Sequence, residues 1–330
     1  MSTHRAFRFI RAGRLAMMSA AVALFAVLSA NPASAQVDLS GTWLNSRYQD
    51  FVAAGDGPLP MELMGIPFNA DGRVAALTFN PEHLEELQRQ CQPYLQYYMF
   101  QDPIGARFYS TTDPITGAVI AWHLTGTIDR MPMTIWMDGR KPPSSRALHT
   151  FSGFTTGSWR GNTLVTMTTH LKQGMLMRAG APASDQATLQ IFWTRHDNQL
   201  MITAVVRDPV YLTAPWVTSQ VWQLSSGTSG YGSITGAVRC VPEETVAGLS
   251  DGYHWSTYPL GKNPNENYMM ENFNIPLEAA TGGAPTMYPE YRKTLAPRFT
   301  VPTQQCTQYC CGAGPPGPPS SGDNASPPAC

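Results

Sequence analysis

Apolar and polar residues alternate with a period of two along the segment from Met133 to Trp216, and short turn sequences separate the alternating runs. Such a period is typical of a β-strand with one buried face, because successive side chains point to opposite sides of a sheet. The clearest pair of runs spans 187–195 and 200–207, joined by a His-Asp-Asn turn. The pattern predicts a β-meander, in which successive strands pair with their neighbours.

Other runs extend the pattern to seven or eight strands: Gly41-x-Trp43, 106–111, 118–125, 133–137, 162–170 and 219–224. This number is typical of a small barrel or a strongly curved sheet. Gly-x-Trp at the start of a first strand is typical of lipocalin-type barrels, and the alternative is a Trp packed in any β core. We therefore expect a mainly β protein, with a lipocalin-like antiparallel β-barrel, short helices and a C-terminal extension.

The segments that flank the meander predict the domain organisation. Residues 1–35 contain four arginines, then an apolar run, then an Ala-Ser-Ala cleavage site. This order indicates a cleaved signal peptide rather than a membrane anchor. Residues 36–224 are expected to form the barrel domain, with a helical insertion at 70–91. Residues 225–300 predict a linker and an extension packed on the barrel, and residues 301–330 a disordered tail rich in Cys, Pro and Gly.

Charge and cysteine content limit the partners and the compartment. Without residues 1–35 the chain has 18 basic and 23 acidic residues and no basic run, so nucleic acid is not an expected partner. No second segment is apolar enough to span a membrane. Six cysteines suit an oxidising compartment, so we expect a periplasmic or secreted protein. Cys91 and Cys240 are a candidate disulfide, although spacing does not fix the pairing.

Several motifs within the meander resemble those of a family of secreted, largely uncharacterised proteobacterial proteins. They are W-M-D-G-R at 136–140, G-S-W-R-G-N-T-L-V at 157–165, T-T-H-L-K at 168–172 and D-P-V-Y-L-T at 208–213. The resemblance covers most of the chain outside the tail and implies no particular activity. Asn162 departs from the acid that such proteins have at this turn, which keeps the turn chemistry but removes a carboxylate.

Polar faces of the predicted strands supply the candidate site. If these faces point into the barrel, four acid–base groups share one wet cavity: His123, Asp138, His170 and His196. The expected ligand-binding residues beside them are Trp122, Trp136, Phe192, Tyr211 and Arg140. The alternative is that the same faces point into solvent. Arg140 is expected to bind a carboxylate or to pair with Asp185 or Asp208, and Asp208-Pro209 is expected to end a strand.

Three classes of function follow. The leading one is an exported barrel that binds a small hydrophobic or aromatic molecule in its cavity. A second is a lyase or isomerase that uses His and Asp as acid and base and needs no cofactor. A third is a structural envelope protein. Zinc is the weaker expectation, because neither H-E-x-x-H nor His-x-His occurs, and the absence of Gly-x-Ser-x-Gly gives serine hydrolysis no support.

Overall fold

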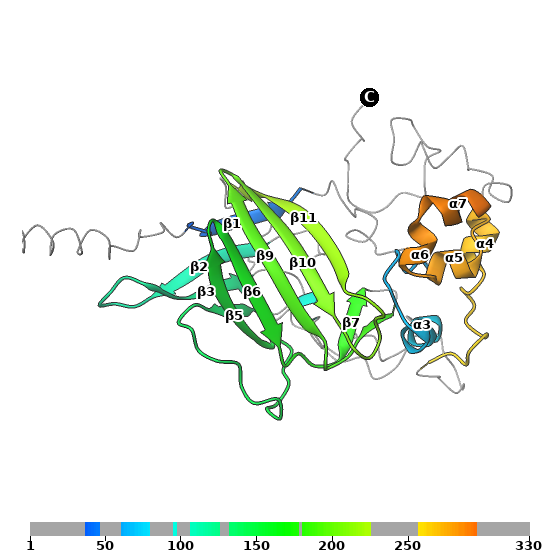
Figure 1. Cartoon of the computed structure of the whole chain (residues 1–330), viewed down its shortest axis with the longest axis horizontal. Helices are drawn as coiled ribbons and strands as arrows, with labels where there is room; N and C mark the ends of the chain where they lie inside the picture. The colour runs from blue at the N-terminus through cyan, green and yellow to red at the C-terminus, as the bar shows by residue number, and fades with distance from the viewer. Residues whose placement is uncertain are drawn as a thin grey trace, which may run out of the picture. The chain divides into compact units, whose positions relative to one another are not determined.

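A closed β-barrel is the main feature of the chain in the computed structural model (Figure 1). The described residues are 37–46, 61–79, 95–97, 106–125, 132–177, 180–225 and 257–295. Every element below belongs to the compact unit Leu39–Cys330. The predicted signal peptide, all six cysteines, the linker after 225 and the tail lie outside the described residues.

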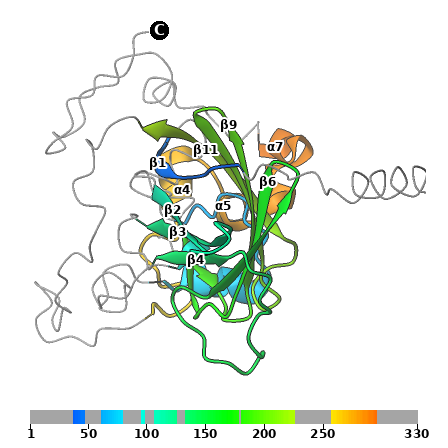
Figure 2. The ribbon, with the colours of Figure 1, turned by 90° about the vertical axis from the view of Figure 1, so that its left-hand side faces the viewer.

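Nine strands form the barrel, in the order β1-β11-β10-β9-β6-β5-β4-β3-β2, and β2 pairs with β1 to close it. Figure 2 shows β1, β2, β3 and β4 along one part of this ring and β6 and β9 along another. The strand bounds are β1 (Gly41–Asn45), β2 (Ala106–Thr112), β3 (Val119–Thr125), β4 (Met133–Trp136), β5 (Phe154–Arg160), β6 (Thr163–Thr169), β9 (Thr188–His196), β10 (Gln199–Arg207) and β11 (Trp216–Ser225). The predicted mainly β barrel is confirmed.

The pairing of strands differs from a simple meander at two places. A ring in which all neighbours run antiparallel needs an even number of strands, so nine strands require a parallel pair. That pair is β4 and β5, with Ile135 opposite Thr155, and residues 137–153 run back along the barrel to make it possible. In addition, β6 pairs with β9, because β7 (Gly174–Met177) and β8 (Ala181–Ala183) form a separate two-stranded sheet.

Apolar side chains occupy the inner face of the barrel, as the alternation along β9 shows. Leu189, Ile191 and Trp193 are fully buried, whereas the residues between them are half-buried. On β10 the same alternation buries Leu200, Ile202, Ala204 and Val206. Burial of these large side chains is the main contribution that the barrel makes to folding, at roughly 1.5–3 kcal/mol each.

An aromatic cluster fills the barrel near the β9–β10 turn. The indole N–H of Trp43 donates to the carbonyl of Leu39 at 2.9 Å, and the Arg195 guanidinium lies over the same ring, 5.3 Å from its centroid. The Trp193 ring packs edge-on against Phe108 at 5.2 Å and against Trp222 at 6.3 Å. The Gly-x-Trp motif therefore opens β1, and its fully buried Trp packs near this end of the barrel.

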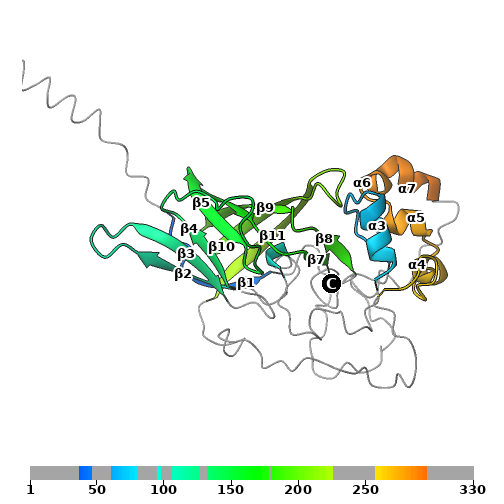
Figure 3. The ribbon, with the colours of Figure 1, turned by 90° about the horizontal axis from the view of Figure 1, so that it is seen from below.

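Helix α3 (Ala70–Leu77) packs on β8, and Figure 3 shows it beside the β7–β8 sheet. Asn69 caps the helix by accepting from the backbone N–H of Gly72 at 2.9 Å. Residues 80–91 lie outside the described part of the chain.

Four short helices form the described part of the C-terminal extension: α4 (Tyr268–Phe273), α5 (Leu277–Thr281), α6 (Ala284–Met287) and α7 (Pro289–Leu295). The extension contacts the segment before α3 and the last residue of α3. The N–H of Leu63 donates to the carbonyl of Ala280, and the Asn263 amide donates to the carbonyl of Leu77. None of the helices in the described ranges is long and apolar enough to cross a bilayer.

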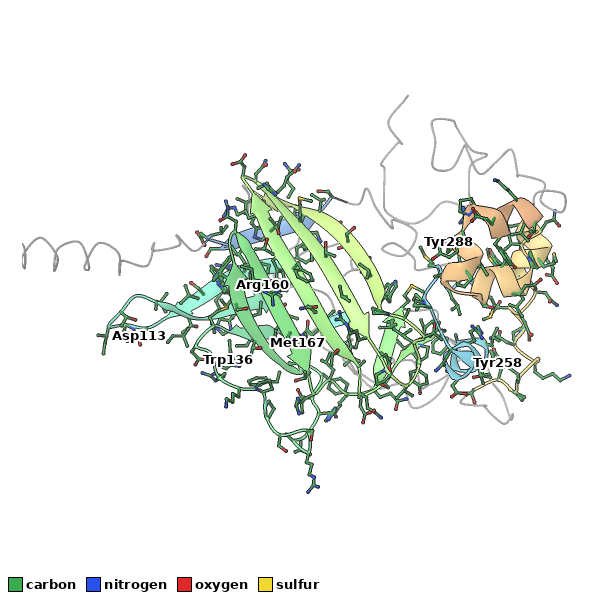
Figure 4. All side chains as sticks on the ribbon, in the orientation of Figure 1. Asp113, Trp136, Arg160, Met167, Tyr258 and Tyr288 are labelled. Carbon is green, nitrogen blue, oxygen red and sulfur yellow. The ribbon has the colours of Figure 1, made fainter. Side chains whose placement is uncertain are left out.

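The β2–β3 hairpin projects from the ring with Asp113 at its tip (Figure 4). The Asp113 carboxylate accepts from the backbone N–H groups of Ile115 and Thr116, each at 2.8 Å. These bonds lower the pKa of Asp113, because they favour the charged form. Asp113 is therefore a turn residue.

Candidate functional site

The inner wall of the barrel is the candidate site, and its central part has small side chains. One cross-strand row passes through β5, β6, β9, β10 and β11 and consists of Gly157, Thr166, Ile191, Ala204 and Thr218. Four of these five residues are glycine, alanine or threonine. The row that includes Trp193 is bulkier, so the central row is where the wall offers least side-chain volume.

The buried threonines of this wall use their hydroxyls within the protein. Thr155 and Thr168 bond each other at 2.8 Å across β5 and β6. Thr166 accepts from the indole N–H of Trp193 at 3.2 Å and donates to the carbonyl of Ile191 at 3.4 Å. These hydroxyls therefore stabilise the wall and have no need of a ligand.

Three buried donors on the inner wall have no hydrogen-bond partner among the described residues: Trp122 Nε1, Trp159 Nε1 and Gln220 Nε2. Trp122 and Gln220 are each 2% exposed. The register places all three on the inner face, since Trp122 is opposite Ile135, Trp159 opposite Leu164 and Gln220 opposite Ile202. Trp122 is a predicted site residue that does face inward.

Sequence reasoning missed Gln220 and Trp159. The signal for Gln220 was its place two residues before Trp222 in an alternating run, which puts both side chains on one face of β11. Trp159 lies before the predicted strand 162–170, in a segment where Gly157 interrupts the apolar alternation. A Cβ at Gly157 would lie 2.7 Å from Ile135 Cγ2 and 2.7 Å from Met137 Sδ, so glycine is needed there for close packing.

His123 lies on the outer face of β3. Its Nε2 is 2.8 Å from the Thr111 hydroxyl and its Nδ1 is 3.2 Å from the Thr134 hydroxyl, on the two neighbouring strands. The Tyr109 ring stacks on the imidazole at 4.9 Å. Partial burial lowers the pKa of His123, because it disfavours the imidazolium ion.

His196 and Phe192 also lie away from the interior, on the face of β9 opposite to Trp193. His196 is the last residue of the strand and is exposed, and Phe192 is half-buried. Tyr211 is half-buried after the end of β10, and its carbonyl accepts from the backbone N–H of Asn69 at 2.9 Å. The side chains of His196 and Phe192 therefore do not join the inner wall.

His170 fastens the connection 137–153 to the end of β6. It has a left-handed backbone, with φ of 57°, and its Nε2 is 2.9 Å from the carbonyl oxygen of Ser144. The His149 ring lies 5.2 Å away, with its Nδ1 2.9 Å from the carbonyl oxygen of Leu171. Each imidazole therefore bonds a backbone carbonyl across the contact between this connection and the end of β6.

Asp138, Arg140 and Trp136 form a local cluster just after β4. The Arg140 guanidinium binds the Asp138 carboxylate, with Nε at 2.9 and 3.0 Å from the two oxygens, and stacks 3.4 Å from the Trp136 ring centroid. Hydrogen bonds from Arg140 lower the pKa of Asp138 to about 2. Arg140 thus pairs with Asp138, which corrects the expectation of a pair with Asp185 or Asp208.

The structure therefore does not bring His123, Asp138, His170 and His196 into one cavity. The faces of β3 and β9 that carry His123 and His196 point away from the interior, which was the alternative. Asp138 and His170 lie just beyond the ends of β4 and β6, and roles for all four residues in catalysis stay predictions. In the described ranges no three His, Cys, Asp or Glu side chains gather as a metal ion would need. The described inner wall offers instead a mainly apolar surface with three unmatched donors.

Comparison of the chain with family models, with curated proteins and with solved structures finds no match. The class of the protein therefore rests on its own fold, a closed nine-stranded barrel compatible with a lipocalin-like architecture. The resemblance to secreted proteobacterial proteins rests on the sequence motifs alone.

Proposed function

We propose that this protein is an exported barrel that binds a small hydrophobic or aromatic molecule in a cavity inside the barrel. The observation that carries the proposal is the set of buried indole and amide donors on the inner wall, for which the described residues supply no acceptor. An unmatched buried donor costs about 1–3 kcal/mol, and a bound ligand can offset that cost. Export is supported by the signal-peptide pattern of residues 1–35.

The positions of the histidines favour binding over acid–base catalysis. A lyase or isomerase of the kind considered above needs a titratable His beside an acid within the ligand site. In the described part of the chain, His123 bonds threonine hydroxyls and His170 bonds a backbone carbonyl. Asp138 binds the neighbouring Arg140, and His196 is exposed. Most residues of the inner wall are apolar, which suits a hydrophobic ligand.

The test is calorimetric titration of the protein without residues 1–35 with 2-acetylnaphthalene and 2-isopropylnaphthalene. We expect saturable binding of one molecule of either naphthalene per chain. Ala204→Phe enlarges the central row of the inner wall and is expected to weaken both about tenfold or more. The control is Met201→Phe. Met201 lies on the outer face of the same strand and is 48% exposed, so this variant is expected to leave binding unchanged.

Overpacking of a buried position typically costs about 1–3 kcal/mol, so the folding of Ala204→Phe is to be checked by circular dichroism. If that variant does not fold, Ala204→Leu adds less volume at the same place. Absence of saturable binding to the unmodified chain would overturn the proposal and favour the structural envelope role. Equal loss of binding in the inner and outer variants would show that the naphthalenes bind elsewhere.

A further inference from the structure

Gln220 has an amide whose two ends have different surroundings. Its side chain is 2% exposed and points inward from β11, opposite Ile202 of β10. Its Oε1 accepts from the indole N–H of Trp222 at 3.0 Å and from the Asn45 amide at 3.4 Å. Its Nε2 has no partner among the described residues.

The orientation of this amide follows from the chemistry of its neighbour. An indole N–H can only donate, so the group that faces Trp222 must be an acceptor. Rotating the amide by half a turn would place its NH2 against the N–H of Trp222 and would lose that bond. The NH2 group of Gln220 is therefore held away from Trp222 as a donor without an acceptor.

All three unmatched groups on the described inner wall are donors. Trp122 and Trp159 contribute indole N–H groups, and Gln220 contributes an amide NH2. A ligand hydroxyl could match a donor, but its own hydrogen would then need an acceptor, whereas a carbonyl oxygen brings only acceptor capacity. The wall is therefore complementary to an oxygen acceptor that brings no donor of its own.

Charge further restricts the ligand. Arg195 is the single charged residue on the inner face of the nine described strands, and its guanidinium lies over Trp43 and donates to the Asp197 carbonyl at 2.7 Å. A carboxylate at Gln220 would be buried beside neutral donors with no cation of its own, which is costly. A neutral carbonyl group meets the same donors without that penalty.

We infer that Gln220 makes the barrel selective for a neutral carbonyl compound, such as a ketone, an ester or a quinone, by donating its amide N–H to the carbonyl oxygen. This inference rests on the proposed function, because it names the chemical class of the ligand for the same inner wall. The two naphthalenes above separate the two claims, since they have similar shape and only 2-acetylnaphthalene has a carbonyl.

The variant Gln220→Met keeps the length of the side chain and removes the donor. It is expected to weaken 2-acetylnaphthalene about tenfold, the usual size of one such hydrogen bond, and to change 2-isopropylnaphthalene less than about twofold. The matched control is Gln223→Met, an exposed glutamine on the same strand, which is expected to change neither affinity.

A second readout needs no variant and applies even if Gln220→Met does not fold. The infrared carbonyl band of bound 2-acetylnaphthalene is expected to lie at lower wavenumber than in an alkane, as hydrogen bonding requires. If both naphthalenes bind but the band is unshifted, or Gln220→Met weakens both equally, the inference about Gln220 fails and the binding function stands. If neither naphthalene binds the unmodified chain, both the proposed function and the inference about Gln220 fail.

Discussion

Asp208 and Ser184 are joined by two hydrogen bonds, each 2.7 Å long, from the backbone N–H and the hydroxyl of Ser184 to the two oxygens of the Asp208 carboxylate. The carboxylate is 3% exposed and also accepts from the backbone N–H groups of Val210 and Tyr211, at 2.9 and 3.3 Å. It thereby ties the end of β8 to the end of β10 at one end of the barrel.

Replacing Asp208 should lower the free energy of unfolding more than a surface substitution does. Asp208→Asn puts an NH2 group where an oxygen now accepts from Ser184, so one donor must face another. We expect a loss of about 2–4 kcal/mol, measured by urea unfolding. Asp185→Asn is the matched control, because Asp185 is exposed next to Ser184, and it should change stability by less than about 0.5 kcal/mol. Similar losses in the two variants would contradict this role for Asp208.

Part of this anchor was visible in the sequence. Asp-Pro predicts the end of a strand, and β10 does end at Arg207 with Asp208 accepting from the two following turn amides. The bond to Ser184 was not predictable, because nothing local specifies which residue of a different connection will reach a given carboxylate.

The ion pair between Arg140 and Asp138 predicts that the pKa of Asp138 changes when Arg140 is replaced. Arg140→Gln removes the guanidinium hydrogen bonds and charge that hold the pKa of Asp138 at about 2, so that pKa should rise toward its ordinary value of 3.8. Carboxyl chemical shifts followed by NMR over acidic pH measure it. Arg146→Gln, an exposed arginine in the same connection, should leave the pKa of Asp138 unchanged.

The direction of the pH effect follows from the lowered pKa of Asp138. The pair stabilises the fold above the ordinary pKa of the carboxyl, and this contribution is lost as the pH falls through about 2. Because the pair is exposed to solvent, the effect on unfolding should be small. A large acid destabilisation that Arg140→Gln abolishes would contradict this estimate.

His123 should titrate below its ordinary pKa of 6.5, because partial burial disfavours the imidazolium ion. The Tyr109 ring covers one side of the imidazole, so Tyr109→Ala should raise the pKa of His123 toward 6.5. Imidazole proton shifts in NMR measure both values. The stabilisation from neutral His123 is present above pH 6.5 and decreases as the pH falls through the lowered pKa.

A control for His123 is Tyr288→Ala, which removes an exposed tyrosine from the segment between α6 and α7. It should leave the His123 titration unchanged. An unaltered pKa in Tyr109→Ala would show that the threonine contacts, and not the tyrosine, keep water from the ring.

Alternation predicted where most strands lie but left open which face points inward. The hairpin of β9 and β10 matches its predicted range within one residue at each end, because its apolar alternation is regular. His123 lies on the outer face of β3 because Trp122 and Leu124, on the other face, are buried inside the barrel. That choice depends on the whole ring and not on any one strand.

The strands that sequence reasoning missed have weak local patterns. Strand β5 contains Gly157 at an inward position, and its other inward residues are Thr155 and Trp159. Strands β7 and β8 are only four and three residues long. The parallel contact of β4 with β5 could not be read from local sequence either, because closure of a ring with an odd number of strands decides it.

Tyr97 predicts how stability changes at alkaline pH. Its ring is fully buried and its hydroxyl has no partner among the described residues. Burial raises the pKa of Tyr97 well above the ordinary 10, and the negative charge of Asp208 adds to the rise. Above about pH 10 the unfolded chain releases this proton while the folded chain keeps it, so the free energy of unfolding should decrease as pH rises.

Tyr97→Phe removes that difference, so its unfolding free energy should fall less steeply above about pH 10 than that of the unmodified chain. At neutral pH the variant should be as stable or up to about 1 kcal/mol more stable, since a buried hydroxyl without a partner is lost. Urea unfolding at neutral and alkaline pH measures both. Tyr109→Phe, at a tyrosine that is 43% exposed, is the control and should keep the original slope. A neutral-pH loss in Tyr97→Phe would mean that this hydroxyl has an acceptor, which would also bring its alkaline slope into question.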